Sequence, residues 1–318
     1  MPGTLALDVN GLQKSYGDRR VLTGLDLRAV KGEVTAILGP NGAGKTTAVE
    51  CCEGLRRPDG GHISVLGLDR RDPRHAQRLR ERVGVMLQEG GLPQAPSAAR
   101  VIRHIARLHA RPRDPQALLA RLGLGDVAHT RVRRLSGGQR QRLALGCAIV
   151  GHPELVFLDE PSSGLDPQSR LAVWQLLREL RTEGTSIVLT THLMAEAETL
   201  ADHVVIVDAG RTLAAGPPDE LRGPLRIRVS APELPDAHAL AERLASSHRD
   251  VQRLGGASGA YLLVSHVEGH DLDAGAVADV ARALDEIGSP GAEIALRRAS
   301  LEDVFLDLTG HELRGETP

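Results

Sequence analysis

Gly39-Pro-Asn-Gly-Ala-Gly-Lys-Thr46 is the segment that most narrows the choice of folds. It matches the phosphate-loop pattern G-x-x-x-x-G-K-[S/T], follows the apolar run Val34–Leu38 and opens a helical segment from Lys45 to Leu55. Glycines at 42 and 44 let the backbone turn tightly and direct N–H groups at phosphate oxygens, and the helix N-terminus adds partial positive charge. Only three of the 39 basic residues are lysines, so a lysine at this position argues against a chance match.

The loop predicts specific contacts with a nucleotide. Lys45 is expected to reach the β- and γ-phosphates and to act in catalysis, and the Thr46 hydroxyl to occupy one position around Mg²⁺. The residues predicted to bind the nucleotide here are Gly39, Pro40, Asn41, Gly42, Ala43, Gly44, Lys45, Thr46 and Thr47.

Composition limits the class of protein. The chain has 318 residues, of which 41% are hydrophobic, enough for one large core or two modest ones. Its 39 basic and 41 acidic residues nearly cancel, so we expect no nucleic-acid partner. The arginines between 70 and 82 favour a solvated helix face over a contact with a partner or with lipid headgroups. No run of about 18 apolar residues occurs, so we expect a cytoplasmic protein that does not itself cross a membrane.

Two domains are predicted from a change in the pattern of apolar residues along the chain. In residues 1–223, apolar runs of strand length alternate with helical segments, which indicates an α/β domain with a parallel sheet covered on both faces. Leu5–Val9 and Leu25–Leu27 alternate in polarity and suggest an antiparallel edge sheet. Between about 88 and 150 the pattern is helical, so a helical subdomain is inserted into the sheet.

Residues 224–318 follow a different pattern, strand-helix-strand-strand-helix-strand, which predicts a small α+β domain of the split-βαβ type. We expect an accessory or regulatory role for it. A closing helix, Leu301–Leu308, aligns Leu301, Val304, Phe305 and Leu308 in one apolar stripe. The stripe either seals its own domain or packs on the first domain or on a second subunit.

An apolar strand, Leu155–Leu158, runs directly into two carboxylates, Asp159 and Glu160. Beside a phosphate loop, such a strand end is suited to hold Mg²⁺ and to activate water. We therefore assign Asp159 to the metal and Glu160 to the attacking water.

Leu135-Ser-Gly-Gly-Gln139 carries a second anion site. Ser136 and Gln139 have the spacing of a capping box, which would only begin a helix. Gly137 and Gly138 are poor in a first helical turn, yet they leave a bare N-terminus that can approach a phosphate. We expect the cap and the anion site to be the same structure.

The motifs together resemble the ABC (ATP-binding cassette) ATPase family over about the first 220 residues. The resemblance implies that Ser136, Gly137, Gly138 and Gln139 contact the γ-phosphate held by a second subunit, in a homodimer that sandwiches two ATP. It implies further that Tyr16 stacks on adenine and that Gln88 senses Mg²⁺ and the membrane partner. Ser163-Gly-Leu-Asp166 would cross the dimer interface, with Asp166 also capping a helix, and His192 would hold the γ-phosphate and the catalytic water.

The complete set of catalytic residues predicts an active ATPase. One cassette per chain, and a short helical interval without sustained heptads, favour the motor of a transporter over a soluble ABC ATPase acting outside transport. Three segments resemble daunorubicin-type drug-export subunits: Ser300–Thr309, Gln88–Leu92 and Thr191–Glu198. That resemblance implies multidrug or antibiotic export with a separate permease, at the cytoplasmic face of the membrane. An importer stays open as an alternative.

Overall fold

The computed structural model describes residues 4–87, 91–222, 225–256, 259–267, 272–289, 291–298 and 300–309. The chain divides into two compact units, the first extending to Pro218 and the second running from Asp219 to Glu312. Each unit is described by itself.

An antiparallel sheet of four strands opens the first unit, in the order β2-β1-β4-β5. Its strands are β1 (Leu5–Tyr16), β2 (Arg19–Val30), β4 (Gly60–Val65) and β5 (Leu68–Asp69). The sheet confirms the antiparallel edge expected from the sequence. β1 and β2 extend well beyond the alternating runs because pairing with a neighbour carries each strand to the turn that joins them.

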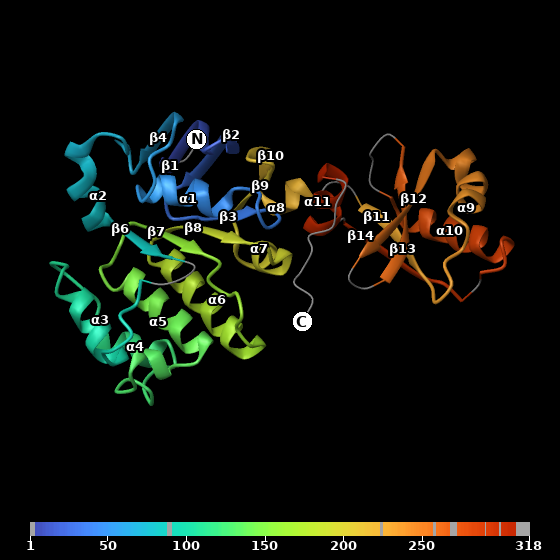
Figure 1. Cartoon of the computed structure of the whole chain (residues 1–318). Coiled ribbons are helices and arrows are strands. Elements are labelled where there is room, and N and C mark those ends of the chain that lie inside the picture. The colour runs from blue at the N-terminus through green and yellow to red at the C-terminus, as the bar shows by residue number, and fades with distance from the viewer. Residues whose placement is uncertain are drawn as a thin grey trace. The chain divides into compact units, whose positions relative to one another are not determined.

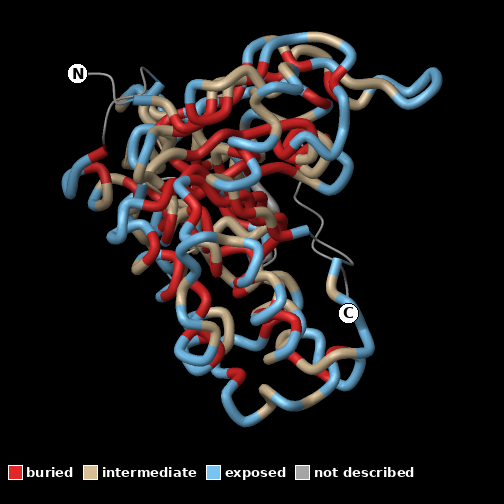
Figure 2. Tube along the Cα trace, turned by 90° about the vertical axis from the view of Figure 1, so that its left-hand side faces the viewer, coloured by how far each residue is buried: buried red, intermediate tan, exposed pale blue. Residues whose placement is uncertain are grey.

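A six-stranded sheet, ordered β10-β9-β3-β8-β7-β6, forms the centre of this unit (Figure 1). Its strands are β3 (Val34–Leu38), β6 (Val83–Met86), β7 (Leu155–Asp159), β8 (Ser186–Thr191), β9 (His203–Asp208) and β10 (Arg211–Gly216). All neighbours are parallel except β9 and β10. Every residue of β3, β7 and β8 is buried, and Figure 2 shows buried positions following these central strands.

Helices cover both faces of the six-stranded sheet, as the continuous apolar strands require. α1 (Lys45–Glu53) lies on one face, and α5 (Gly137–Ile149) and α6 (Pro167–Thr182) lie on the other (Figure 1). The shorter helices of the unit are α2 (Ala76–Arg82), α7 (Met194–Leu200) and α8 (Pro218–Leu221), the last of which spans the boundary between the units.

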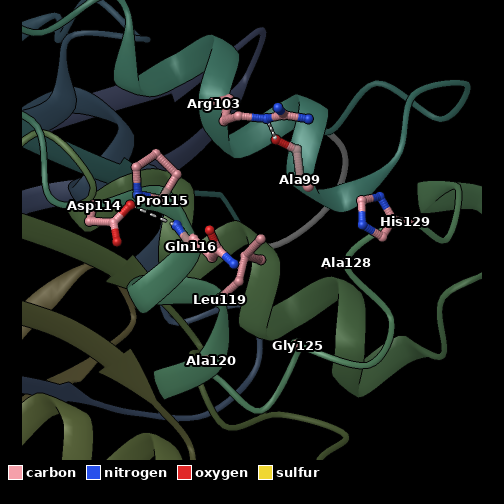
Figure 3. A pocket seen from close by; sticks show the side chains of 10 residues that line it. All are labelled: Ala99, Arg103, Asp114, Pro115, Gln116, Leu119, Ala120, Gly125, Ala128 and His129. Carbon is pink, nitrogen blue, oxygen red and sulfur yellow. Dashed lines mark hydrogen bonds between the residues drawn. The ribbon is translucent and has the colours of Figure 1, made fainter.

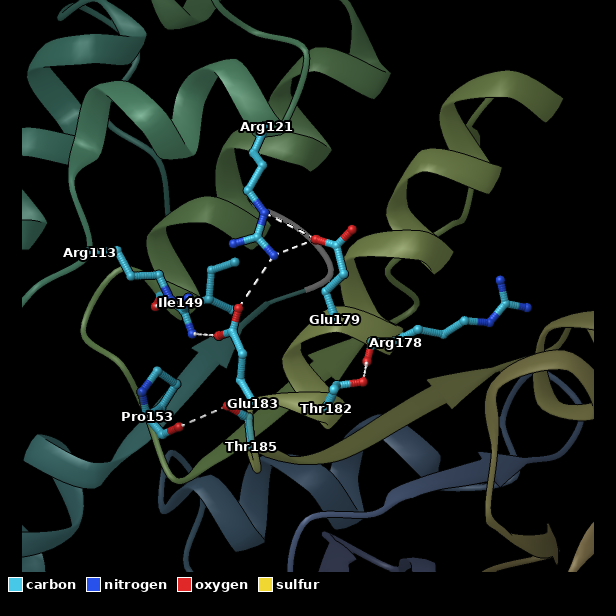
Figure 4. Close-up of polar contacts among 9 residues, drawn as sticks. All are labelled: Arg113, Arg121, Ile149, Pro153, Arg178, Glu179, Thr182, Glu183 and Thr185. Carbon is cyan, nitrogen blue, oxygen red and sulfur yellow. Dashed lines mark hydrogen bonds and ion pairs between the residues drawn. The ribbon is translucent and has the colours of Figure 1, made fainter.

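The helical subdomain comprises α3 (Ala98–Ala106), α4 (Pro115–Arg121) and α5. The helical pattern of the sequence runs from Ser97 to Ala110, whereas α3 ends at Ala106, and the chain turns ahead of Pro112, where helical backbone becomes unfavourable. Ion pairs tie the subdomain to the C-terminal end of α6 (Figure 4): Arg121 pairs with Glu179 and Glu183, and Arg113 lies 2.6 Å from Glu183. The subdomain is thereby held against the helix that follows the acidic strand end.

The second unit has the predicted order of elements and one antiparallel sheet, β12-β13-β11-β14. Its elements are β11 (Leu225–Ser230), α9 (Ala237–Leu244), β12 (Arg249–Gly256), β13 (Gly259–His266), α10 (Ala274–Glu286), β14 (Glu293–Arg298) and α11 (Leu301–Thr309). Ile227, Val229, Leu262 and Val264 form a core with side chains of α9 and α10. The expected split-βαβ pattern is confirmed.

α11 is fastened to the sheet of its own unit. Asp303, 2% exposed, accepts hydrogen bonds from the Tyr261 hydroxyl on β13 and from the backbone N–H of Ser300. On the predicted stripe, Leu301 and Phe305 are buried, whereas Leu308 is 46% exposed. The hydrogen bond between Asp303 and Tyr261 holds α11 against the sheet of its own unit, as expected if the apolar stripe seals its own domain.

The stripe provides a test of how α11 is held. Replacing Phe305 by alanine should destabilise the second unit by about 3–5 kcal/mol, because a buried aromatic side chain leaves a cavity. Leu308→Ala is the matched control and should cost less than about 1 kcal/mol because Leu308 is exposed. Hydrogen exchange of the β13 amides in the full chain measures both effects. Equal losses of protection in the two variants would contradict this assignment.

Candidate nucleotide and metal site

The phosphate loop connects β3 to α1 and depends on glycine at two close approaches. A Cβ at Gly39 would lie 2.2 Å from the carbonyl oxygen of Val207. Gly44 has φ of 100°, and a Cβ there would lie 2.8 Å from the side chain of Leu22. The loop therefore packs directly against neighbouring backbone and side chains, and no side chain fits at either position.

Lys45 is buried inside this loop, with 6% of its surface exposed. Its Nζ donates hydrogen bonds to the carbonyl oxygens of Gly39 at 2.8 Å and Pro40 at 3.1 Å. Burial lowers the pKa of Lys45, while the charges of Glu160 and Asp159 oppose that shift. The loop thus encloses a cationic group whose present partners are neutral carbonyls, which phosphate oxygens can replace.

Asp159 ends β7 and is buried beside the loop. It accepts a hydrogen bond from the Thr190 hydroxyl on β8. Burial raises the pKa of Asp159, and hydrogen bonds with Thr190 and Thr46 lower it. The contact with Thr46 brings two predicted magnesium ligands together.

Those ligands fit Mg²⁺, because a hydroxyl and one carboxylate are the hard oxygen donors that this ion takes from protein when phosphates complete its coordination. Gln88, the third predicted metal ligand, lies outside the described residues.

Glu160 adopts a left-handed backbone conformation with φ of 48°, which is unusual for a residue other than glycine. Its N–H is shared between the carbonyl oxygen of Thr190 at 3.2 Å and the Thr190 hydroxyl at 3.0 Å. Its carbonyl oxygen accepts a bond of 2.8 Å from the Gln141 side chain on α5. Such a conformation costs about 1–3 kcal/mol, and these bonds hold it in place.

Glu160 and His192 form the close pair of the site. The Nδ1 atom of His192 lies 3.2 Å from Oε1 of Glu160, at ion-pair distance but at an angle outside hydrogen-bond geometry. This pairing raises the pKa of His192 and lowers the pKa of Glu160. Glu160 is therefore kept ionised, as a group that accepts a proton from water must be.

A pocket of about 920 Å³ joins these groups. The predicted residues that line it are Tyr16, Asn41, Gly42, Gly44, Lys45, Thr46, Thr47, Glu160 and His192, together with Ser163 and Gly164 of the predicted interface loop. Tyr16 is 41% exposed, and the side chains of Lys14 and Arg56 lie over its ring, 5.5 Å and 5.4 Å from the centroid. Ala43 is buried in the loop and donates a backbone bond to Pro40.

A smaller pocket of about 420 Å³ lies in the helical subdomain, between α3 and α4 (Figure 3). Arg103, Asp114 and His129 contribute to its wall. Of the described residues that line it, none is a predicted site residue, and the chemistry described above lies in the larger pocket.

The Ser136–Gln139 segment forms the expected cap at the start of α5. The Ser136 hydroxyl accepts from the Gln139 N–H at 3.2 Å, and the Gln139 side chain accepts from the Ser136 N–H at 2.9 Å. Asp166 likewise caps α6 by accepting from the Ser169 N–H at 2.9 Å. Among the described residues that line the large pocket, neither Asp166 nor any residue of this segment is present. Ser136, Gly137 and Asp166 are exposed instead.

Two residues that hold the acidic pair in place are not predicted from the sequence. From β8, Thr190 bonds the Asp159 carboxylate and the Glu160 backbone N–H, and its only sequence signal is a hydroxyl near the end of an apolar strand. Gln141 follows the glycine pair of α5, where its amide was indistinguishable from an ordinary helical side chain.

Comparison with known proteins gives a consistent result. The family model described as ABC transporter matches residues 22–163. The daunorubicin resistance ATP-binding protein DrrA3 of Streptomyces coeruleorubidus is 40% identical over 97% of both chains. A Nod factor export ATP-binding protein I of Ralstonia nicotianae is 36% identical over 98% of this chain and 96% of its own. A solved ATP-binding subunit of an ABC transporter superposes with a TM-score of 0.62 at 29% identity, covering 69% of this chain and 92% of that one.

The Glu160–His192 pair predicts a measurable titration. The pair stabilises the fold fully between the unfolded pKa values of glutamate, about 4.3, and histidine, about 6.5. That contribution is lost as the pH rises through the raised pKa of His192 or falls through the lowered pKa of Glu160. NMR titration of the nucleotide-free protein should give His192 a pKa above the ordinary value, and Glu160→Gln should lower it. An identical His192 titration in both proteins would show that the pair does not form.

Proposed function

Because the chain belongs to the ABC transporter family as an ATP-hydrolysing subunit, we propose that it powers an exporter of drugs or other amphiphilic molecules together with a separate membrane permease. The observation that carries the hydrolytic part is that Lys45, Glu160 and His192 line one pocket, while Asp159 interacts with Lys45 and Thr46 beside it. The export part is supported by the relatives, whose names refer to daunorubicin resistance and to Nod factor export.

Nucleotide binding follows from the loop and the aromatic ring. Adenine stacks on the partly exposed ring of Tyr16, and the backbone N–H groups of the loop and the N-terminus of α1 hold the phosphates. Lys45 exchanges its bonds to the Gly39 and Pro40 carbonyls for bonds to phosphate oxygens. Thr46 and Asp159 would hold Mg²⁺, which when bound neutralises negative charge on the phosphates.

Hydrolysis needs a water molecule in line with the γ-phosphorus. Glu160 accepts a proton from that water as its oxygen bonds to phosphorus and the bond to the bridging oxygen of ADP breaks. His192 lies next to Glu160 and donates a hydrogen bond to the γ-phosphate, holding it and the water in place. The products are ADP and inorganic phosphate.

The active form that we propose is a homodimer. The bare N-terminus of α5, with Ser136 and Gly137, is exposed and lies outside the pocket of its own chain. A γ-phosphate in the pocket therefore has no contact with this anion site until a second copy supplies its own. Asp166, exposed at the start of α6, would lie at the same interface.

Transport is favoured over a role outside it by full-length similarity to export proteins, which extends through the second unit. None of the helices in the described parts of the chain is long and apolar enough to span a bilayer. We propose that the protein binds the cytoplasmic face of the membrane through its permease, and that the second unit adjusts how readily the dimer closes.

The first test concerns catalysis. Glu160→Gln should retain ATP binding and lose turnover by about 10²- to 10⁴-fold, because the general base is removed. Lys45→Ala should lose nucleotide binding as well, and Glu81→Gln, an exposed carboxylate on α2, should behave as wild type. With ATP, Glu160→Gln should elute from gel filtration as a dimer. Wild-type turnover in Glu160→Gln would refute the catalytic role, and a monomer with normal ATP affinity would refute the dimer.

The second test concerns the membrane. Expressed alone, the protein should be recovered in the supernatant after ultracentrifugation, and it should sediment with membranes only when its permease is co-expressed. Membrane protein that co-purifies with the chain from its own cells identifies that permease. Tight sedimentation with protein-free liposomes would contradict the proposal and favour direct lipid binding by the arginines between 70 and 82.

A further inference from the structure

A buried polar network lies next to the catalytic pair but is not part of it. Oε1 of Glu196 accepts hydrogen bonds from the Ser162 hydroxyl at 2.5 Å and from the Trp174 indole N–H at 3.0 Å. The same indole N–H lies 3.1 Å from the Ser162 oxygen. Ser162 is 0%, Glu196 1% and Trp174 8% exposed, so solvent does not support these bonds.

Each member belongs to a segment that carries a proposed functional residue. Ser162 follows Glu160 by two residues, and Glu196 follows His192 by four. Trp174 lies on α6, the helix that Asp166 caps. One carboxylate oxygen of Glu196 therefore links three segments: the loop that follows Glu160, the turn that follows His192, and α6, which begins after the predicted interface loop.

Burying these polar groups lowers the stability of the fold unless their hydrogen bonds are kept. A buried carboxylate must be hydrogen-bonded, and removing it leaves the buried Ser162 hydroxyl without its acceptor and the Trp174 indole N–H with only the Ser162 oxygen. α7 has only seven residues and its N-cap is Leu193, whose side chain cannot accept a hydrogen bond, so the bonds of Glu196 help to hold this short helix in place. The turn that presents His192 is thus fixed at one end by β8 and at the other by Glu196.

An electrostatic effect supports the same conclusion. The pairing with Glu160 is the main cause that raises the pKa of His192, and the negative charge of Glu196 adds to it. Glu196 therefore influences His192 through the field as well as through the backbone of α7.

We propose that Glu196 is a positioning residue that, through Ser162 and Trp174, holds Glu160 and His192 in the arrangement needed for hydrolysis. The proposal rests on the roles proposed above for these two residues. It predicts a loss in turnover without a loss in nucleotide binding, because the network touches neither Lys45 nor Tyr16.

The experiment compares steady-state ATP hydrolysis by the full-length protein and its variants. Glu196→Ala should lower kcat by about 10- to 100-fold, as expected when catalytic groups shift, and leave KM within about twofold of wild type. Glu196→Gln keeps an acceptor oxygen and should retain most of the activity. Thr199→Ala, an exposed position on the same helix, is the matched control and should hydrolyse ATP at the wild-type rate.

A double-mutant cycle separates positioning from general packing. If Glu196 acts through the pair, the effect of Glu196→Ala should shrink to about twofold or less when His192 is already alanine. An undiminished effect in that background, or an equal loss in Glu196→Gln and Glu196→Ala, would overturn the proposal.

Two further variants keep the test decisive should Glu196→Ala fail to fold. Ser162→Ala and Trp174→Phe each remove one donor and should lower kcat less, again without raising KM. Trp174 is the only tryptophan of the chain, so its emission spectrum reports directly whether its environment survives in each variant. Full activity in the network variants with an inactive Glu160→Gln would refute this inference alone, whereas an active Glu160→Gln would refute the proposed function.

Discussion

The buried ammonium group of Lys45 organises the site. A buried ammonium group needs polar partners to stay charged. Lys45 donates hydrogen bonds to the carbonyl oxygens of Gly39 and Pro40, and these bonds keep the loop folded around its side chain. The loop lies at the end of β3, whose Leu38 is level with Thr191 on β8, while Thr190 is level with Asp159 on β7. Parallel strands end at the same edge of a sheet. The register of β7 and β8 with β3 therefore places the acidic residues and the histidine near Lys45.

The same architecture leaves the glycine-rich start of α5 out of the lining of the chain's own pocket. Side chains of Ser136 and Gln139 cap this helix start, and neither residue lines the large pocket. Ion pairs to α6 hold the helical subdomain that presents this helix start. In the homodimer proposed above, each site would be completed only by a second copy, and hydrolysis would be timed by whatever brings two copies together.

The sequence is most informative where the functional groups are local. The phosphate loop, the carboxylates after Leu158 and the glycine pair of α5 each place their groups within a few residues, so their spacing predicts a role, and the structure places the loop and the carboxylates next to each other. The split-βαβ unit is predicted from the order of its strand and helix segments, of which Leu225–Val229 alternates in polarity. The roles of Thr190 and Gln141 could not be predicted from the sequence, because their contacts with Glu160 form only when β8 and α5 pack next to it. The sequence pattern overestimates the length of α3, because Leu108 and Ala110 continue the apolar pattern beyond its end at Ala106.

The Glu196 network shows the same limit in a sharper form. Ser162, Trp174 and Glu196 lie on separate segments, and each alone is compatible with an ordinary loop or helix residue. An apolar side chain at position 196 would satisfy the burial of α7 without the cost of desolvating a carboxylate. A buried acid is therefore a poor choice for stability by itself, and it is found where the chain immediately before α7 carries His192. Residues that are unfavourable for local packing concentrate at functional sites. The buried carboxylate of Glu196 is such a residue, and it lies where the segments that carry Glu160 and His192 meet.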